Sequence, residues 1–533
     1  MHVSLLKLPV LLLAGATLLL AAVGAAPARE PVPVPATPSA SAGNSSPLYP
    51  IPAPRALAQP EADDGEEMVE IPSPWQMVTD GFDSLEDDGN EDSKARISDE
   101  ALGILEVPDR PPLLLEWNGD FLGRGELSQG IELPTGAIWR PSLWVFGTNR
   151  VAFQFFEDHK TTNSLELVER LDLFTQLNLS GTERLLLGLR PFDREKYSQR
   201  RYTSYDFTAG QYIDGINIIP QTLLFEGDFG EIFPNLDPFD TQAIDYGFSI
   251  GRQPVFVQSG IFIAADFLDA VSVTRNTLAG NGVLNSRMTF MFAPGSVHRN
   301  DGLSYYVLAR DAQMYAVFTE TDFASTTINA NFAYVHSDNP TTGDGLNFGT
   351  SAAQRLQPGN ETINSTFHAL GCLPTGQETL ATGKGLLLVS ELSTAPAGTE
   401  NHAYFNSFWA IGNYVSPTRG VQMGGPLAPV AGILFAKPQI GVFGSPISNL
   451  AEDVAGASVG YQYMWDGIKK QLTWEIGGRQ STSSAQTSAI GIGALYQQAV
   501  SQHTVFILNA AVVKAEGVSS PDVGARMEIL TKF

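Results

Sequence analysis

The sequence predicts an all-β protein: a transmembrane antiparallel β-barrel of about 18 strands, preceded by a disordered N-terminal arm. Three observations support this fold class. The chain ends in an alternating strand that stops on the aromatic residue Phe533, and it begins with the pattern of an export signal. Between the two ends, strand-sized runs that alternate apolar and polar residues are separated by Gly, Pro, Asn and Asp.

The last nine residues form a strand with one apolar and one charged face. Alternate positions carry apolar residues and Thr on one side and Arg526, Glu528 and Lys532 on the other, with Leu530 as the exception. Because successive side chains of a strand point to opposite faces, this pattern predicts a strand with one face buried and the other in contact with water. Its ending on Phe resembles the closing strand of bacterial outer-membrane barrels. A C-terminal strand of a soluble domain is the alternative, and the rest of the chain decides between them.

The N-terminus predicts export. Residues 1–28 have the pattern of a secretory signal peptide, with an apolar run over 8–23. Ala26-Pro27-Ala28 fits an A-x-A cleavage site, and Val23-Gly24-Ala25 is an alternative. We expect cleavage rather than anchoring, because the run is short and no strongly charged stop follows it. The only cysteine, Cys372, leaves no intramolecular disulfide.

Residues 29–111 predict a disordered arm in the periplasm. Its first part is rich in Pro, Ala and Ser, and residues 61–110 hold 17 Asp and Glu but only three Lys and Arg, out of a net charge of −25 for the whole chain. Such a segment cannot bury enough apolar surface to offset its ordering entropy. The acidic run Ser84 to Asp92 resembles a calcium loop in composition, but its spacing does not match, so we expect no metal site there.

Residues 112–533 are predicted to form the barrel. From Leu165 to Asn178, Leu167 and Leu171 share one face while Arg170 and Asp172 share the other. In a barrel the leucines would meet lipid and the charged residues a wet lumen. About 420 residues at roughly 22–26 per strand and connection allow 16 to 18 strands, and we favour 18.

The C-terminus also sets the orientation. If Phe533 ends in the periplasm, counting strands backwards places the Asp466-Gly467 turn on the periplasmic side and the long stretch 415–455 outside. That stretch is unusually apolar from Gly424 to Phe435. The sequence supports two interpretations equally. In one, this stretch folds into the barrel as a constriction or lid, and in the other it packs as a cap on the rim.

Several short motifs resemble porins of the alginate-export type. They are Asn178 to Arg184, Arg190-Pro191-Phe192-Asp193-Arg194, and Gly251-Arg252-Gln253 followed by Asp266, Asp269 and Val273-Thr274-Arg275-Asn276. The resemblance covers about a quarter of the chain. It implies an 18-stranded barrel that conducts a solute across the outer membrane, with charged lumen residues setting selectivity. The chain departs from it in being acidic even without the arm, whereas a polyanion path should be basic.

The alternation predicts a set of pore-lining residues of both charges. They are Arg170, Asp172, Arg184, Arg190, Glu475, Arg526 and Glu528. Two further clusters have two interpretations each. Arg190, Arg194, Lys196, Arg200 and Arg201 attract anions at the mouth, or form an exposed loop. The acidic and aromatic run Glu226 to Asp240 is an inward solute-binding loop, or an ordinary surface loop.

The predicted function is an outer-membrane porin for passive diffusion or export of small hydrophilic or charged solutes, in contact with membrane lipids and lipopolysaccharide. No catalytic motif, cofactor fingerprint or metal-spaced His pair is present, and the basic pattern for nucleic acid is missing. Two alternatives remain: a sleeve that houses a periplasmic or redox partner, and an outer-membrane enzyme whose site is assembled across strands. The acidic arm could tether a periplasmic partner.

Overall fold

The computed structural model of the chain describes residues 113–123, 129–157, 163–196, 199–239, 244–280, 282–300, 306–309, 312–339, 342–358, 362–379, 381–420, 422–483 and 486–533. The predicted signal peptide (1–28) and acidic arm (29–111), with its calcium-like run, lie outside these residues. The first long strand begins at Ser142, later than the predicted barrel boundary at residue 112.

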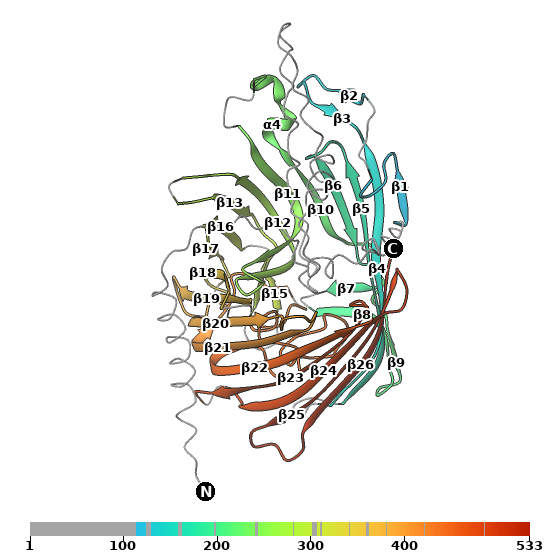
Figure 1. The fold of residues 1–533 in the computed structure, drawn as a ribbon, viewed down its shortest axis with the longest axis vertical. Helices are drawn as coiled ribbons and strands as arrows, with labels where there is room; N and C mark the ends of the chain where they lie inside the picture. Colours follow the sequence, from blue (N-terminus) through green and yellow to red (C-terminus); the bar gives the residue numbers. More distant parts are fainter. Residues whose placement is uncertain are drawn as a thin grey trace, which may run out of the picture. The chain divides into compact units, whose positions relative to one another are not determined.

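Eighteen long strands form one antiparallel sheet that closes on itself, as the sequence predicts, and Figure 1 shows them following one another in chain order. They are β4 (Ser142–Glu157), β5 (Ser164–Asn178), β6 (Arg184–Leu189), β10 (Pro220–Asp228), β11 (Tyr246–Val257), β12 (Ile263–Arg275), β13 (Asn285–Ala293), β16 (Gln313–Asp322), β17 (Thr326–His336), β18 (Gly345–Leu356), β19 (Ile363–Pro374), β20 (Lys384–Thr394), β21 (His402–Tyr414), β22 (Ala451–Trp465), β23 (Lys470–Ser481), β24 (Ala489–Ala499), β25 (Thr504–Ala515) and β26 (Asp522–Lys532).

The barrel closes between its first and last wall strands. β26 pairs with β4 from Val523↔Glu157 to Lys532↔Thr148. Beyond the paired residues, the backbones of Phe533 and Gly147 exchange two hydrogen bonds of 2.8 and 3.1 Å. The short strand β1 (Leu115–Trp117) then pairs with the part of β4 that lies past the end of β26. Closure removes the open sheet edges that would otherwise be left unpaired.

The two ends of the barrel have different connections. At the end that carries Ser142 and Phe533, β22 joins β23 through residues 466–469, and β24 joins β25 through 500–503. At the opposite end, β6 joins β10 through residues 190–219, and β21 joins β22 through 415–450. The turn at Asp466-Gly467 therefore lies at the same end as Phe533, and the long loop lies at the opposite end, as counting strands backwards from Phe533 predicts.

The wall strands present an apolar face outward and a largely polar face inward. On β26, Met527 and Ile529 are about half exposed, whereas Arg526 and Glu528 are buried in the barrel interior. On β24, Ile490 and Ile492 face outward and alternate with inward glycines. The outward side chains match the lipid-facing band of a transmembrane barrel.

The remaining elements belong to the connections, and one of them, Gln199–Asp206, also pairs with β5 of the wall. They are β2 (Ile131–Glu132), β3 (Ile138–Trp139), β7 (Asp193–Lys196), β8 (Gln199–Asp206), β9 (Gln211–Ile213), the helix α4 (Phe229–Ile232), the 3₁₀ helix η2 (Pro234–Leu236), β14 (Val297–Asn300) and β15 (Tyr306–Ala309). Among the described residues, no helix has the length and apolar character needed to cross a membrane.

Candidate pore constriction

All seven predicted pore-lining residues lie on the lumen side of the wall. They are Arg170 and Asp172 on β5, Arg184 at the start of β6, Arg190 just after it, Glu475 on β23, and Arg526 and Glu528 on β26. Arg184 forms an ion pair with Glu226 of β10 near the end that carries the chain terminus. The others lie further inside. Arg170, Arg190 and Glu475 contact segments of chain that fold into the lumen. Asp172, Arg526 and Glu528 form ion pairs with neighbouring side chains.

The first such segment is the tip of the β11–β12 hairpin, residues 253–268. β10 pairs with β11 only through Arg252, and β12 pairs with β13 only from Val271 onward. Between these limits the hairpin strands pair with each other and with no neighbouring wall strand. Residues 261–265 of the tip are almost completely buried on both faces. A strand that leaves the wall and is covered on both sides must lie within the barrel.

The hairpin tip is fastened by Gln258 to wall strands that begin three places along the sheet from β12. The Gln258 side-chain amide donates to the Thr350 carbonyl at 2.8 Å and accepts from Asn331 at 3.1 Å. His368 lies 3.4 Å from the same amide through Nδ1, and its Nε2 is 2.8 Å from Glu391. These contacts join the tip to four consecutive wall strands, β17 to β20.

The second segment is the long connection 415–450, here called the long inward loop. The Glu475 side chain accepts hydrogen bonds of 2.9 Å from the backbone amides of Ile433 and Leu434. Ser458 donates to the Ala431 carbonyl at 2.6 Å, and Glu166 accepts from the Val442 amide at 2.6 Å. Inward side chains of the wall therefore supply the partners that an irregular backbone needs inside a barrel.

Glycines on the wall make room for this loop. Gly477, Gly491 and Gly493 all face inward, and a Cβ on any of them would lie within about 3.5 Å of the Leu434 side chain. The alternation Ile490-Gly491-Ile492-Gly493 thus places isoleucine toward lipid and leaves space for the loop. The loop enters the lumen, as one of the two sequence interpretations holds.

The hairpin tip and the long inward loop meet inside the barrel. The Arg419 guanidinium donates to the carbonyls of Gly260 and Ile261 at 2.6 and 3.0 Å. The Gly420 amide donates to the Ala264 carbonyl at 2.8 Å. The two segments therefore form one unit across the lumen.

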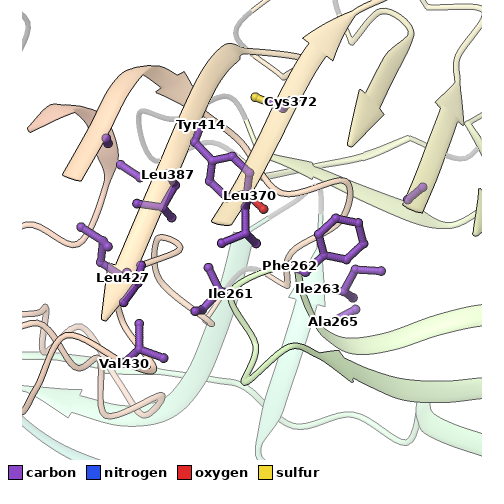
Figure 2. Close-up of a cluster of buried hydrophobic side chains, with 14 of the residues drawn as sticks. Ile261, Phe262, Ile263, Ala265, Leu370, Cys372, Leu387, Tyr414, Leu427 and Val430 are labelled. Atoms are coloured by element: carbon purple, nitrogen blue, oxygen red, sulfur yellow. The ribbon is translucent and has the colours of Figure 1, made fainter. Parts of the chain in front are cut away.

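An apolar cluster fills the space between this unit and one side of the wall. Figure 2 shows Ile261 and Phe262 of the hairpin tip together with Leu427 of the loop and Leu370 of β19. Tyr414 and Cys372 lie in the same cluster. Burial of these side chains drives both segments into this half of the lumen.

The other side of the lumen is charged. Arg190 contacts Asp172 at 2.6 Å and Asp266 at 3.1 Å. Asp172 also accepts a bidentate pair of bonds from Arg170, at 2.7 and 3.1 Å. Arg170 in turn donates to the Gln439 carbonyl of the long inward loop at 2.8 Å. This chain of contacts runs from the hairpin through the wall to the loop.

A second charged group lies beside it on β4 and β26. Arg150 contacts Glu528 at 2.7 Å and donates to the Pro438 carbonyl at 3.1 Å. Arg526 pairs with the same Glu528 carboxylate. Arg150 and Arg526 share this one carboxylate, so this side of the lumen carries charges of both signs.

A third segment contributes one side chain. Tyr202 of β8 is buried against Ile440, and its hydroxyl donates to the Gln439 carbonyl at 2.9 Å.

In the predicted basic cluster, Arg190 has the partners given above and Arg194 donates to the Asp214 carbonyl at 3.0 Å. The side chains of Lys196, Arg200 and Arg201 lie outside the described part of the structure.

The acidic and aromatic run 226–239 forms an ordered connection at the end that carries the chain terminus. It contains α4 and η2, and Asp228 caps α4 by accepting from the Gly230 amide at 2.9 Å. Phe239 is 85% exposed, and Asp240 lies outside the described residues. A cavity of about 310 Å³ lies between this connection, the β5–β6 turn and β3.

Sequence reasoning missed several residues that shape the constriction. Arg150, Glu166, Gln258 and Arg419 were not singled out, and Asp266 entered only through the family resemblance. One signal was available: Ile261-Phe262-Ile263-Ala264-Ala265 is a continuous apolar run, whereas the strands from which the wall was predicted alternate. Such a run indicates burial on both faces. Within the described ranges, no group of three or more His, Cys, Asp or Glu could hold a metal ion.

Comparisons with known proteins bear on the fold. No family model matches the chain, and no curated protein matches it. OccAB2 of Acinetobacter baumannii shares 8% identity and a TM-score of 0.50, over 73% of this chain and 98% of that one. OccK2 (OpdF) of Pseudomonas aeruginosa shares 9% identity and a TM-score of 0.50, over 73% and 97%. A BenF-like porin from Pseudomonas fluorescens Pf-5 shares 10% identity and a TM-score of 0.49, over 74% and 98%.

The fold is thus the 18-stranded barrel of solved porins. At this identity the likeness concerns the fold alone.

Proposed function

We propose that the protein is an outer-membrane porin through which small hydrophilic solutes diffuse passively. The observation that carries this proposal is a closed wall with an apolar outer face and charged side chains inside. Only a closed barrel or a helix satisfies all its backbone groups within lipid. Polar groups on the inner face then favour a water-filled path.

The width of the barrel supports a channel with an internal constriction. A barrel of 16 to 18 strands is too wide to be filled by the side chains of its own wall. Here the hairpin tip 253–268 and the long inward loop occupy part of the interior and leave the charged groups of β4, β5 and β26 on the other side. The size limit for solutes would be set where these two segments narrow the lumen.

The same geometry disfavours the sleeve interpretation. A barrel that houses a partner protein must leave its lumen free, and in this chain two of its own segments are bonded across the lumen. For the enzyme interpretation, the part of the chain that the structure describes offers no arrangement on which to build a reaction. The alginate-export resemblance stays a prediction for the barrel type, and the mixed charge around Arg170 and Glu528 favours smaller solutes than a polyanion.

The proposed orientation has the chain terminus and short turns in the periplasm, with the long inward loop entering from outside. The outward band would contact lipid, and the outer rim lipopolysaccharide. Residues 29–111 would follow signal cleavage as a periplasmic arm, where their acidic charge could engage a periplasmic partner.

The direct test is conductance in a planar bilayer, using the full mature chain refolded in detergent. We expect stable, open single channels that persist at moderate voltage, and a protein that inserts but stays silent would contradict the proposal. A variant with residues 424–448 replaced by a short Gly-Ser linker should show a higher conductance. An unchanged pore size in that variant would contradict the constriction role of the loop.

A further inference from the structure

We propose that Arg190 and Asp266 act as positioning residues, which hold the β11–β12 hairpin against the wall and so set the pore width, rather than as free charges that select ions. This inference rests on the proposed porin function. The inference concerns how the constriction is held in place, which the barrel fold alone does not determine.

The burial of the two side chains is the first observation. The Asp266 side chain is 2% exposed and that of Arg190 is 13% exposed. A charge that attracts or repels passing ions must face the water they travel in. These two groups face each other across 3.1 Å and present little surface to the lumen.

The position of the contact in the fold is the second observation. Residues 253–268 have left the wall, so the neighbouring strands β10 and β13 no longer bond to this part of the hairpin. Gln258 fastens the tip to β17, β18 and β19. Arg190 fastens the hairpin on the opposite side, to the region where β6 ends and β5 supplies Asp172. The hairpin is therefore held on both of its flanks, by wall strands that lie before it and after it in the sheet.

The link from Arg190 to the long inward loop is the third observation. Asp172 accepts from both Arg190 and Arg170, and Arg170 donates to the Gln439 carbonyl. One wall carboxylate thereby joins the hairpin and the loop. Because charge-assisted and bidentate bonds are strong and directional, this connection fixes the separation of the two segments that narrow the lumen.

The experiment compares Arg190→Gln, Asp266→Asn and the double variant in single-channel recordings. The two substitutions change the lumen charge in opposite directions. Free charges would therefore shift the reversal potential in a salt gradient in opposite directions, and the double variant would return it to the wild-type value. Positioning residues predict the contrary: both single variants raise the conductance, and the double variant raises it no further than either one.

A matched control comes from another pair on the lumen wall. Arg287 of β13 and Glu320 of β16 lie 3.4 Å apart with side chains 37% and 44% exposed. Both side chains are partly exposed, so Arg287→Gln and Glu320→Gln should shift the reversal potential in opposite directions. This control shows that the recordings detect a single charge.

Backbone hydrogen exchange provides a readout that does not depend on conduction. In Arg190→Gln and Asp266→Asn, amides within residues 253–268 should exchange faster by about tenfold, with the wall strands β22 to β25 unchanged as an internal check on folding. The inference is overturned if exchange in 253–268 is unchanged in both single variants, or if the double variant restores the wild-type conductance. A wild-type protein that is silent in bilayers would instead contradict the proposed function, and the exchange data would still test the positioning role.

Discussion

Replacing Glu475 by alanine should detach the long inward loop from the wall while leaving the barrel intact. The Glu475 side chain is fully buried and accepts from the amides of Ile433 and Leu434 and from the Tyr404 hydroxyl. Alanine removes the acceptor for all three donors. The wall strand β23 keeps its backbone pairing with β22 and β24, because the substitution changes no backbone group.

The free energy lost by the attached loop follows from the two backbone amides that lose their acceptor. Leaving a buried amide without a partner costs about 1–3 kcal/mol, so two amides cost about 2–6 kcal/mol. At about 1.4 kcal/mol per factor of ten, the attached position of the loop would become less favourable by roughly one and a half to four powers of ten. Water entering from the lumen can re-bond the amides, so we expect a value near the lower end.

Hydrogen exchange over residues 431–436, followed by mass spectrometry, measures this directly. Exchange should be faster in Glu475→Ala and intermediate in Glu475→Gln, which keeps one acceptor oxygen. Gln471→Ala is the matched control, because Gln471 lies on the same face of the same strand and bonds to Gln462 and Gln497 of the wall. Exchange that is unchanged in Glu475→Ala, or accelerated equally in Gln471→Ala, would refute the reasoning.

Three other predictions can be checked by equilibrium measurements. Gly432→Ala should also loosen the loop, seen as faster exchange of its amides, because Gly432 has φ +118° and a Cβ there would overlap the carboxyl group of Glu475. Deleting Phe533 removes two backbone bonds to Gly147 and should lower the free energy of unfolding by about 1–3 kcal/mol in denaturant titrations. The hydrogen bond and charge of Lys470 lower the pKa of Asp466 in its turn below the usual 3.8, so their stabilising effect is present above that value and lost as pH falls below it. The difference in unfolding midpoint between wild type and Asp466→Asn should therefore shrink between about pH 5 and about pH 3.

Much of the wall could be predicted because its pattern is local. The strand predicted over the last nine residues is found at Asp522–Lys532, and the turn at Asp466-Gly467 has both residues at positive φ. Alternation fixes which side chains share a face, and a chain ending on a half-buried strand sets the direction of each strand before it. These inferences need only neighbouring residues and a count of strands.

The constriction could be predicted only in part, because its contacts join distant parts of the chain. Alternation places Arg150 and Glu475 on the inner face, but the partners of these side chains are Pro438 and the amides of 433 and 434. Nothing in a strand pattern gives the height at which a loop of 36 residues (415–450) will lie inside a barrel. Glu475 was predicted to line the pore, and the structure places it beneath the loop.

The inner charges therefore fall into two groups with different physical roles. An irregular segment inside a barrel brings backbone amides and carbonyls that need partners, and charged side chains such as Glu475 and Arg170 provide them at the cost of their own exposure. Side chains that remain open to the lumen, such as Glu320, keep their charge available to solutes. A wall strand alone cannot separate the two groups, because both occupy inward positions. Exposure of the side chain separates them, and it marks Glu320 rather than Glu475 as the place to look for ion selectivity.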